Sequence, residues 1–449
     1  MIVLSSGVLI SVSIHPGHNW SGDFALYIQQ AAAILDGSLN SLYALNKFSM
    51  QHSISEKGPF LYPNGFPLIL TPIYYFFGVD LVKIKILCST FLLGSIPLAY
   101  SLFRQYFSNG FHPIIVIVFM ALNVSFIQFT DSIRSELPFL FFSLLSFRLM
   151  YKEPKLIGQL LLGLCAFFTY YIRDIGIFLL PALLIFQLFF NQNLLAKIKG
   201  FVIPVVVFFG LWTVNMMTSL NGGENHIRIL LESTTMSSIS LNFRYYVELV
   251  SVYFFNEEFF LLGIVVMSVA GIGIAANIKK SAPIAVYVIS VLGIVFIWPS
   301  QQGIRFLLPV LPFIALFLLQ GILFLTDMLR FNKKIVNLVL LVATLSFIDN
   351  SVDRVLQEQT IQTNQSCTEE MMEIYLYVSQ EIPANSVVGF HQPRILRLFS
   401  GVNSIFTDLA HFGNSVGTHL VIRNDEVNSE NSNQFAVKHR FKNYMVLEK

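Results

Sequence analysis

The sequence predicts an all-α polytopic membrane bundle followed by a small α/β domain. Of its 449 residues, 55% are hydrophobic, only 12% are charged and 44 are phenylalanine, which is too apolar for an ordinary soluble surface. Apolar segments recur along the first part of the chain, and a bilayer-spanning segment of this kind must be helical to satisfy its own backbone. The net charge of +2 and the three scattered cysteines give no sign of nucleic-acid binding or of a disulfide framework.

About eleven spans are expected from the lengths of the apolar segments. The first, Met1 to Ile14, is shorter than the roughly 17 to 25 residues of an ordinary span, which suggests a late assigned start or a thinned membrane. It lacks the basic n-region and the cleavage site of a removable signal peptide. The other ten lie near 80–103, 112–130, 137–151, 156–172, 175–190, 199–217, 258–277, 282–299, 305–326 and 335–348.

The basic residues of the short loops predict the orientation, because cytoplasmic loops carry the excess of Lys and Arg. Alternate loops hold Arg104, then Lys152 and Lys155, then Lys197 and Lys199, then Lys279 and Lys280, then Arg330, Lys333 and Lys334. These loops are therefore expected in the cytoplasm. The same rule places outside the long first loop at 15–79, the loop at 218–257 and the tail from about 349.

The tail differs from the membrane part in composition, so a domain boundary is expected near residue 349. The membrane domain would be 1–348, with its first outer loop at 15–79, and the extracytoplasmic α/β domain 349–449. Residues 368–381 have helical periodicity, whereas 386–390, 418–423 and 444–447 are typical of buried strands. Residues 424–433 are polar enough to predict a mobile loop.

Asp23 stands at the start of an apolar helical repeat in the first outer loop. Phe24, Tyr27, Ile28, Ala31 and Ile34 recur at helical spacing, which predicts an apolar stripe along the membrane surface. Asp23 either faces an outer cavity as a functional acid or caps this helix through a backbone N–H. The next apolar stretch, broken by prolines at 59, 63, 67 and 72, is expected to be interfacial or re-entrant rather than spanning.

Ionisable residues stand at three outer helix ends, where such groups pair with each other or line a functional cavity. They are Asp131, Arg134 and Glu136, then Arg173 and Asp174, then Arg305. Two local ion pairs, Arg173 with Asp174 and Arg134 with Glu136, are the simpler interpretation. Arg305 has no acidic neighbour in the sequence, and its guanidinium suits a phosphate, so it is the better candidate for binding an anion.

Three histidines, His15, His18 and His52, share the first outer loop with Asp23. No helical pair of histidines occurs there, and isolated surface histidines are more often solvated than ligands of a metal. No cofactor is firmly predicted, and a divalent metal is left open.

The chain resembles the bacterial glycosyltransferases of the GT-C superfamily, which includes the protein mannosyltransferases and the lipid A aminoarabinose transferase. The resemblance rests on an N-terminal span and five ordered motifs: GDFALYIQQA, YPNGFPLILTPIYYFFG, SELPFLFFSLL, YIRDIGIFLLPALL and GIRFLLPVLPFIAL. It implies a hexosyl- or pentosyltransferase of the cell membrane, with a bacterial inner or plasma membrane expected. The enzyme would move a sugar from a polyprenyl-phosphate donor to an extracytoplasmic lipid, glycan or protein.

The resemblance also implies roles for individual residues. Asp23 matches the catalytic aspartate of the first outer loop, and Glu136 matches a second acid, as glutamate where aspartate is common. Tyr62 and Pro63 match a tyrosine-proline pair, although Asn64 stands where a second proline is usual. Arg305 is the candidate for the basic residue that binds the lipid phosphate.

The chemistry agrees with these roles, because displacing a polyprenyl phosphate from an anomeric carbon needs a base and a positive charge on the leaving group. Asp23 would be the base, with Arg305 and Arg173 at the phosphate and Tyr62 and Arg134 as further substrate-binding residues. Direct displacement would invert the anomeric configuration. Two alternatives remain: a flippase or other transporter of lipid-linked sugars, for which no inverted repeat is evident, and a non-catalytic assembly factor for envelope polysaccharide.

Overall fold

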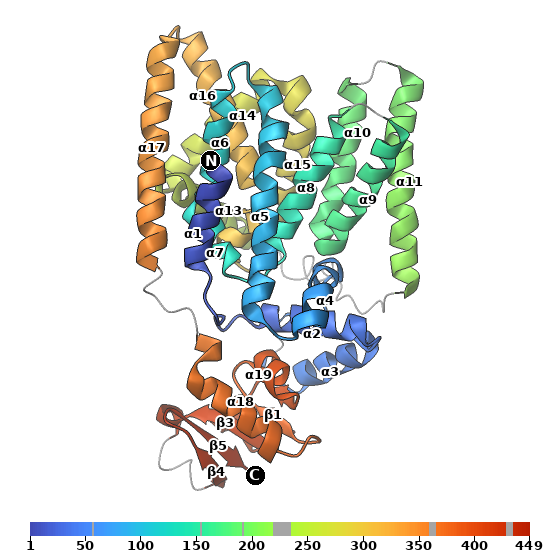
Figure 1. Ribbon diagram of the computed structural model, residues 1–449, viewed down its shortest axis with the longest axis vertical. Coiled ribbons are helices and arrows are strands. Elements are labelled where there is room, and N and C mark those ends of the chain that lie inside the picture. The colour runs from blue at the N-terminus through green and yellow to red at the C-terminus, as the bar shows by residue number, and fades with distance from the viewer. Residues whose placement is uncertain (56–57, 153–154, 191–192, 219–234, 359–364, 428–433) are drawn as a thin grey trace. The chain divides into compact units, whose positions relative to one another are not determined.

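The computed structural model describes residues 1–55, 58–152, 155–190, 193–218, 235–358, 365–427 and 434–449. These residues form two compact units, which Figure 1 shows as ribbons. The helical unit comprises the described residues of 1–14 and 85–358. The α/β unit comprises those of 15–84 and 365–449.

The helical unit is built from apolar helices joined by short turns. Its helices are α1 (Ile2–Ser13), α5 (Leu81–Phe103, from Lys85 onward), α6 (Phe111–Ala121), α7 (Val124–Thr130), α8 (Glu136–Met150), α9 (Leu156–Ile172), α10 (Leu179–Phe190), α11 (Leu194–Thr218), α13 (Met236–Phe255), α14 (Phe260–Ala276), α15 (Ile278–Ile297), α16 (Leu311–Met328) and α17 (Lys333–Glu358). Short 3₁₀ turns lie at η1 (Arg104–Tyr106), η2 (Asp174–Phe178) and η3 (Gly303–Phe306).

Each predicted span overlaps one of these helices or a helix with its adjoining 3₁₀ turn, except the span at 112–130, which is divided between α6 and α7. Within the described residues, five helices are long and apolar enough to cross a membrane, or up to seven if each of two bent pairs forms one span. The chain is thus a multi-pass, α-helical membrane protein, as predicted. The number of about eleven spans stays a prediction, since several of the remaining apolar helices are short.

One of the bent pairs has a clear cause in the sequence. Helices α6 and α7 meet at 51°, and Asn123 stands at the break, where it is 2% exposed. Its side chain accepts a hydrogen bond from the Ser125 N–H at 2.8 Å and donates one to the Tyr253 carbonyl at 3.0 Å. The side chain therefore takes over bonding that a continuous helix would make through its backbone.

Small residues bring α14 and α16 into close contact. A Cβ atom on Gly273 would lie 2.0 Å from the Phe317 carbonyl oxygen, and one on Gly321 would lie 1.9 Å from that of Val269. No side chain fits at these two positions, which is the packing expected of helices that associate through small residues in a membrane.

The predicted outer loop at 218–257 contains a helix in its second half, α13 (Met236–Phe255), which the sequence analysis did not identify. Thr235 and Ser238 form a capping box at its start, and Asn256 ends it in a left-handed conformation with φ 60°. The helix escaped prediction because polar residues such as Asn242 and Arg244 dilute its apolar signal. Residues 219–234 lie outside the described part of the chain.

The α/β unit combines the first outer loop with the C-terminal tail. Its helices are α2 (Gly22–Leu35), α3 (Leu39–Gln51), α4 (Gly65–Phe77), α18 (Glu369–Glu381), α19 (Pro393–Ser400) and α20 (Leu409–Phe412), with 3₁₀ turns η4 (Gln365–Cys367) and η5 (Asn424–Glu426). Its strands are β1 (Val387–Gly389), β2 (Asn403–Ile405), β3 (His419–Arg423), β4 (Ala436–Arg440) and β5 (Tyr444–Glu448).

The five strands form one mixed sheet in the order β2-β1-β3-β5-β4. Strand β1 pairs in parallel with β2 and β3, whereas β5 pairs antiparallel with β3 and β4. The predicted helix in the tail and three predicted strands are confirmed as α18, β1, β3 and β5. Residues 428–433 of the predicted mobile loop lie outside the described residues.

One expectation about this unit is wrong, and two others, the domain boundary and the interfacial position of the proline-broken stretch, stay predictions. The apolar stripe of α2 is not a membrane-facing surface: Phe24, Tyr27, Ile28 and Ala31 are at most 5% exposed, because α2 packs against α3, α4 and α19. Helix α17 continues past residue 349, where the sequence placed the domain boundary, and the tail shares its unit with the first outer loop. Helix α4 is too short to span and exposes several large apolar residues, namely Leu68, Tyr75, Phe76 and Phe77.

Candidate functional site

Three arginines of the helical unit gather around one buried carboxylate; they are called the arginine cluster below. The Glu136 side chain is 1% exposed, and its Oε1 atom lies 2.9 Å from Arg173 Nη1 and 3.1 Å from Arg305 Nε. Arg134 is close enough for its charge to act on the same carboxylate. Glu136 is the first residue of α8, where a negative charge also interacts favourably with the helix dipole.

The turns that carry two of these arginines are set by glycine. Arg173 ends α9 in an extended conformation, and its carbonyl accepts a hydrogen bond from the Gly176 N–H at 2.8 Å. A Cβ atom on Gly176 would lie 2.5 Å from the Tyr170 nitrogen, so only glycine closes this turn. Arg305 lies in η3, which begins at Gly303 with φ 66°, a left-handed conformation that glycine adopts without strain.

The cluster has more positive than negative charge. Among the described residues, three guanidinium groups act on one carboxylate, an excess of two positive charges, and the side chains of Arg173 and Arg305 remain 16% and 20% exposed. Arg134 Nε is buried, and no described group makes a hydrogen bond with it. A buried donor left without an acceptor is costly, so an anion bound here would gain a hydrogen bond as well as charge.

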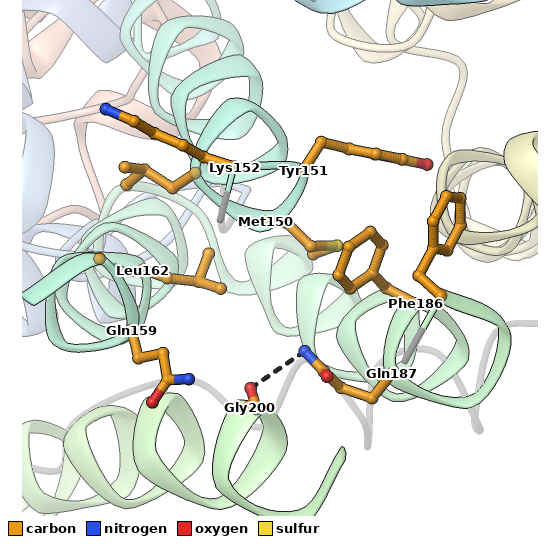
Figure 2. A pocket seen from close by; sticks show the side chains of 11 residues that line it. Met150, Tyr151, Lys152, Gln159, Leu162, Phe186, Gln187 and Gly200 are labelled. Carbon is orange, nitrogen blue, oxygen red and sulfur yellow. Dashed lines mark hydrogen bonds between the residues drawn. The ribbon is translucent and has the colours of Figure 1, made fainter. Parts of the chain in front are cut away.

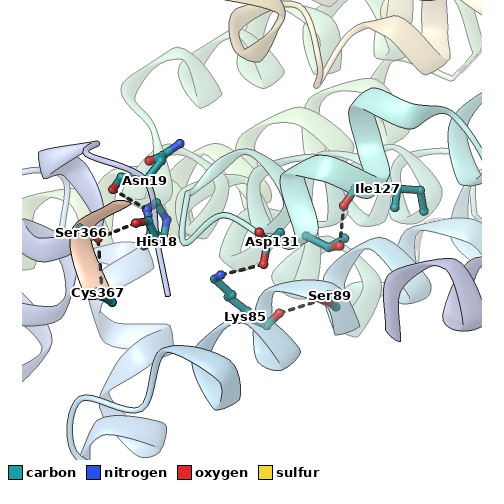
Figure 3. A network of polar contacts seen from close by, with 9 residues as sticks. His18, Asn19, Lys85, Ser89, Ile127, Asp131, Ser366 and Cys367 are labelled. Atoms are coloured by element: carbon teal, nitrogen blue, oxygen red, sulfur yellow. Dashed lines mark hydrogen bonds and ion pairs between the residues drawn. The ribbon is translucent and has the colours of Figure 1, made fainter. Parts of the chain in front are cut away.

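The simpler interpretation, two ion pairs between sequence neighbours, is not what the structure contains. Arg173 contacts Glu136, and Arg305 contacts the same Glu136 from 169 residues away. Asp131 pairs instead with Lys85 of α5, whose fully buried ammonium lies 2.7 Å from Asp131 Oδ1 (Figure 3). Lys85 was not predicted as a site residue because it lies within a predicted span. No acidic residue follows it in that span to indicate an ion pair.

Asp23 and Tyr62 form a hydrogen-bonded pair in the α/β unit. The Tyr62 hydroxyl donates to Asp23 Oδ1 at 2.6 Å, and the Tyr62 ring stacks on Tyr27 with centroids 4.5 Å apart. Burial and the negative charge of Asp23 raise the pKa of the Tyr62 phenol well above its ordinary value. The phenol therefore keeps its proton at neutral pH and donates to the carboxylate.

The capping alternative for Asp23 is not supported by its position. Ser21 is the N-cap of α2 and Asp23 is the second residue of the helix, partly exposed. The hydrogen-bond partner of Asp23 is Tyr62 of the YP motif, 39 residues later in the sequence. Tyr62 is fixed in turn by Gln30, which accepts from the Tyr62 N–H at 2.8 Å and donates to the Tyr62 carbonyl at 2.9 Å.

A separate cavity of about 220 Å³ lies among α8, α9, α10 and α11 (Figure 2). It is lined by the C-terminal end of α8, including Met150 and Tyr151, and by the partly polar side chains of Gln159 and Gln187; Gln187 donates to the Gly200 carbonyl at 3.2 Å. Glu136 stands at the opposite end of α8. None of the predicted site residues lines this cavity.

The histidines of the first outer loop are engaged in other contacts. The carbonyl of His18 accepts hydrogen bonds from Ser366 (Figure 3), its ring stacks on Phe24, and the ring of His52 lies 2.9 Å from the Phe48 carbonyl. In the described part of the chain, no three His, Cys, Asp or Glu side chains gather as a metal site would require.

Comparison with known proteins finds similarity in structure but not in sequence. No family model and no curated protein matches the sequence. The structure of ArnT from Cupriavidus metallidurans bound to undecaprenyl phosphate matches with a TM-score of 0.63 and 12% identity, covering 99% of this chain and 97% of ArnT. The chain has the GT-C fold.

A more distant protein shares the GT-C fold. The archaeal oligosaccharyltransferase AglB from Archaeoglobus fulgidus, in complex with an inhibitory peptide and a dolichol-phosphate, matches with a TM-score of 0.53 and 10% identity. The match covers 94% of this chain and 69% of AglB. At these identities the likeness establishes the GT-C fold, and function has to be argued from the site.

Proposed function

We propose that this protein is a GT-C glycosyltransferase that moves a sugar from a polyprenyl-phosphate donor to an extracytoplasmic acceptor, with inversion at the anomeric carbon. The observation that carries the proposal is the arginine cluster, whose excess positive charge and unsatisfied buried donor, Arg134 Nε, suit a phosphate. Further support comes from the two proteins of like fold, which were captured with undecaprenyl phosphate and dolichol-phosphate.

The reaction assigns a separate task to each group. Asp23 takes the proton of the acceptor hydroxyl, and the hydroxyl oxygen forms a bond to the anomeric carbon. The bond between that carbon and the phosphate oxygen breaks, and its electron pair leaves with polyprenyl phosphate. Arg305, Arg173 and Arg134 bind that phosphate and stabilise the charge that grows on it. Because the acceptor attacks the face opposite the leaving group, the configuration inverts.

Glu136 has a supporting role in this scheme. Its carboxylate is buried and already contacts two arginines, so it acts by aiming their guanidinium groups rather than by exchanging a proton. Tyr62 orients Asp23 through its 2.6 Å hydrogen bond.

The test is a transfer assay on purified protein with undecaprenyl phosphate that carries a radiolabelled hexose or pentose. The enzyme should release undecaprenyl phosphate and place the label on water or an added lipid acceptor. Asp23→Asn should lower the rate by about 100-fold or more because the base is lost. Asp36→Asn is a matched control, since Asp36 is exposed at the other end of the same helix, α2.

The assay also separates the rival functions. A transporter or an assembly factor binds the lipid-linked sugar but leaves the bond between sugar and phosphate intact. Binding without release of undecaprenyl phosphate from any of the labelled donors contradicts the proposal. Full activity of Asp23→Asn removes Asp23 from the chemistry.

A further inference from the structure

Helix α19 of the C-terminal tail presents two arginines to the first outer loop. Arg394 and Arg397 are three residues apart and therefore neighbours on one face of the helix. Gln29 of α2 joins them: its Nε2 atom donates to the Arg394 carbonyl at 2.8 Å, and its Oε1 atom accepts from Arg397 Nε at 3.1 Å and Nη2 at 2.8 Å. The tail and the helix that begins near Asp23 are thus directly connected.

The Arg394 side chain reaches the segment that carries Tyr62. Its Nη2 atom donates to the Pro59 carbonyl at 2.6 Å. Gly58 has φ 79°, and a Cβ atom there would lie 3.0 Å from Arg394 Nη1, so a side chain at 58 would meet both backbone strain and the guanidinium. The charge of Arg394 also acts on the Tyr62 phenol.

The same side chain lies against the start of α2. A Cβ atom on Gly22, the residue before Asp23, would be 3.7 Å from Arg394 Cδ and 3.5 Å from Gln392 Oε1. One arginine of the tail therefore bonds to the segment that carries Tyr62 and lies close to the start of α2. A charge-assisted hydrogen bond to a carbonyl is stronger than a neutral one, so this contact restrains the segment from 58 to 62.

We propose that Arg394 is a positioning residue for the Asp23–Tyr62 pair, and that the C-terminal tail is for this reason a structural part of the reaction centre. This inference rests on the proposed function. It assigns to the tail an effect on the catalytic base itself.

The first test needs no activity and compares amide hydrogen exchange in the wild type, Arg394→Gln, Arg394→Lys and Arg440→Gln. Arg440 is an exposed residue of β4 in the same tail and serves as the matched control. In Arg394→Gln, exchange at residues 58–64 and at the start of α2 should be about tenfold faster, the size expected for loss of one charge-assisted hydrogen bond. Arg394→Lys keeps the charge and should fall between the two. Unchanged exchange in Arg394→Gln would overturn the inference.

The second test is a double-mutant cycle in the transfer assay. Arg394→Gln alone should lower kcat about tenfold and leave the KM of the donor nearly unchanged. In a Tyr62→Phe background it should have little further effect, because its action passes through Tyr62. Additive losses of activity, or a change in donor KM alone, would overturn the positioning role. A wild type that releases no undecaprenyl phosphate would instead count against the proposed function and leave the exchange result to decide the role of Arg394.

Discussion

Glu136 is a buried carboxylate whose charge is balanced by arginines of other elements. Its single oxygen Oε1 contacts both Arg173 and Arg305 at 1% exposure, and removing one partner of a buried ion pair leaves charges that nothing compensates. Glu136→Gln keeps the shape of the side chain but leaves three guanidinium groups to repel one another. We expect the free energy of unfolding to fall by about 3 to 5 kcal/mol, measured as a lower thermal midpoint in detergent.

The control for this variant is Glu248→Gln. Glu248 pairs with Arg244 at 3.0 Å, four residues earlier on α13, but these side chains are 26% and 70% exposed. An exposed pair of this type contributes about 0.5 kcal/mol or less, so the thermal midpoint should barely move. Equal effects of the two substitutions would show that burial of the arginine cluster does not stabilise the protein.

At the scale of residues, the sequence identified the types of side chain but not their partners. Asp23, Tyr62, Glu136 and Arg305 were all predicted as site candidates from short motifs, and their roles stay predictions. The contact between Glu136 and Arg305 spans 169 residues, and no local pattern encodes a distance of that kind. Lys85 was missed for the same reason, since its partner Asp131 lies 46 residues away on another element.

At the scale of elements, helix α13 supports the turn that carries Arg305. The hydroxyl of Tyr246, which is 1% exposed, accepts a hydrogen bond from the Gln302 N–H at 3.1 Å. Tyr246→Phe leaves that N–H without its acceptor and loosens the turn at η3. We expect the affinity for undecaprenyl phosphate to weaken about three- to tenfold, measured by the thermal shift that the lipid produces at increasing concentration.

The neighbouring Tyr245 provides the control, because it is partly exposed and makes a ring contact with Tyr246 at 5.1 Å. Tyr245→Phe also removes a phenolic hydroxyl from this turn of the helix, but it should leave the affinity for undecaprenyl phosphate unchanged. Equal loss in both variants would mean that the helix as a whole, and not the bond to Gln302, determines binding.

Helix α13 also shows where pattern recognition fails for elements. Its buried residues Tyr246, Val247, Val250, Tyr253 and Phe254 recur at helical spacing, so a signal was present. The segment was nevertheless predicted as loop because its mean hydropathy is lowered by serine, asparagine and charged residues. Helices that are apolar along their whole length, such as α5, α9 and α15, were predicted with ends within a few residues of those observed.

At the scale of the whole molecule, the fold could be predicted although sequence identity to the proteins of like fold is only 10 to 12%. The order of apolar segments and of a few motifs survives such divergence, because the membrane constrains helix length and polarity far more than it constrains individual residues. What the pattern cannot supply is the grouping of the tail with the first outer loop in one unit, which arises from contacts such as Arg394 with Pro59.

The positive-inside rule makes a prediction about the whole chain that cysteine labelling can check. Cys88 and Cys165 are buried and should not react, so Cys367→Ser yields a suitable background. In it, His411→Cys places an exposed thiol in the tail and Lys152→Cys places one in a loop rich in lysine. We expect a membrane-impermeant maleimide added to intact cells to label the first variant and not the second, while both react after the membrane is opened.

The comparison between the two variants decides which side of the membrane each loop faces. The polyprenyl chain of the proposed donor lies in the membrane, and the expected acceptor lies outside the cytoplasm. The proposed reaction therefore needs the C-terminal tail and the first outer loop on the outer side. Labelling of Lys152→Cys in intact cells, with protection of His411→Cys, would reverse the orientation of every loop. Asp23 would then face the cytoplasm, and the sugar could be transferred only before it crosses the membrane.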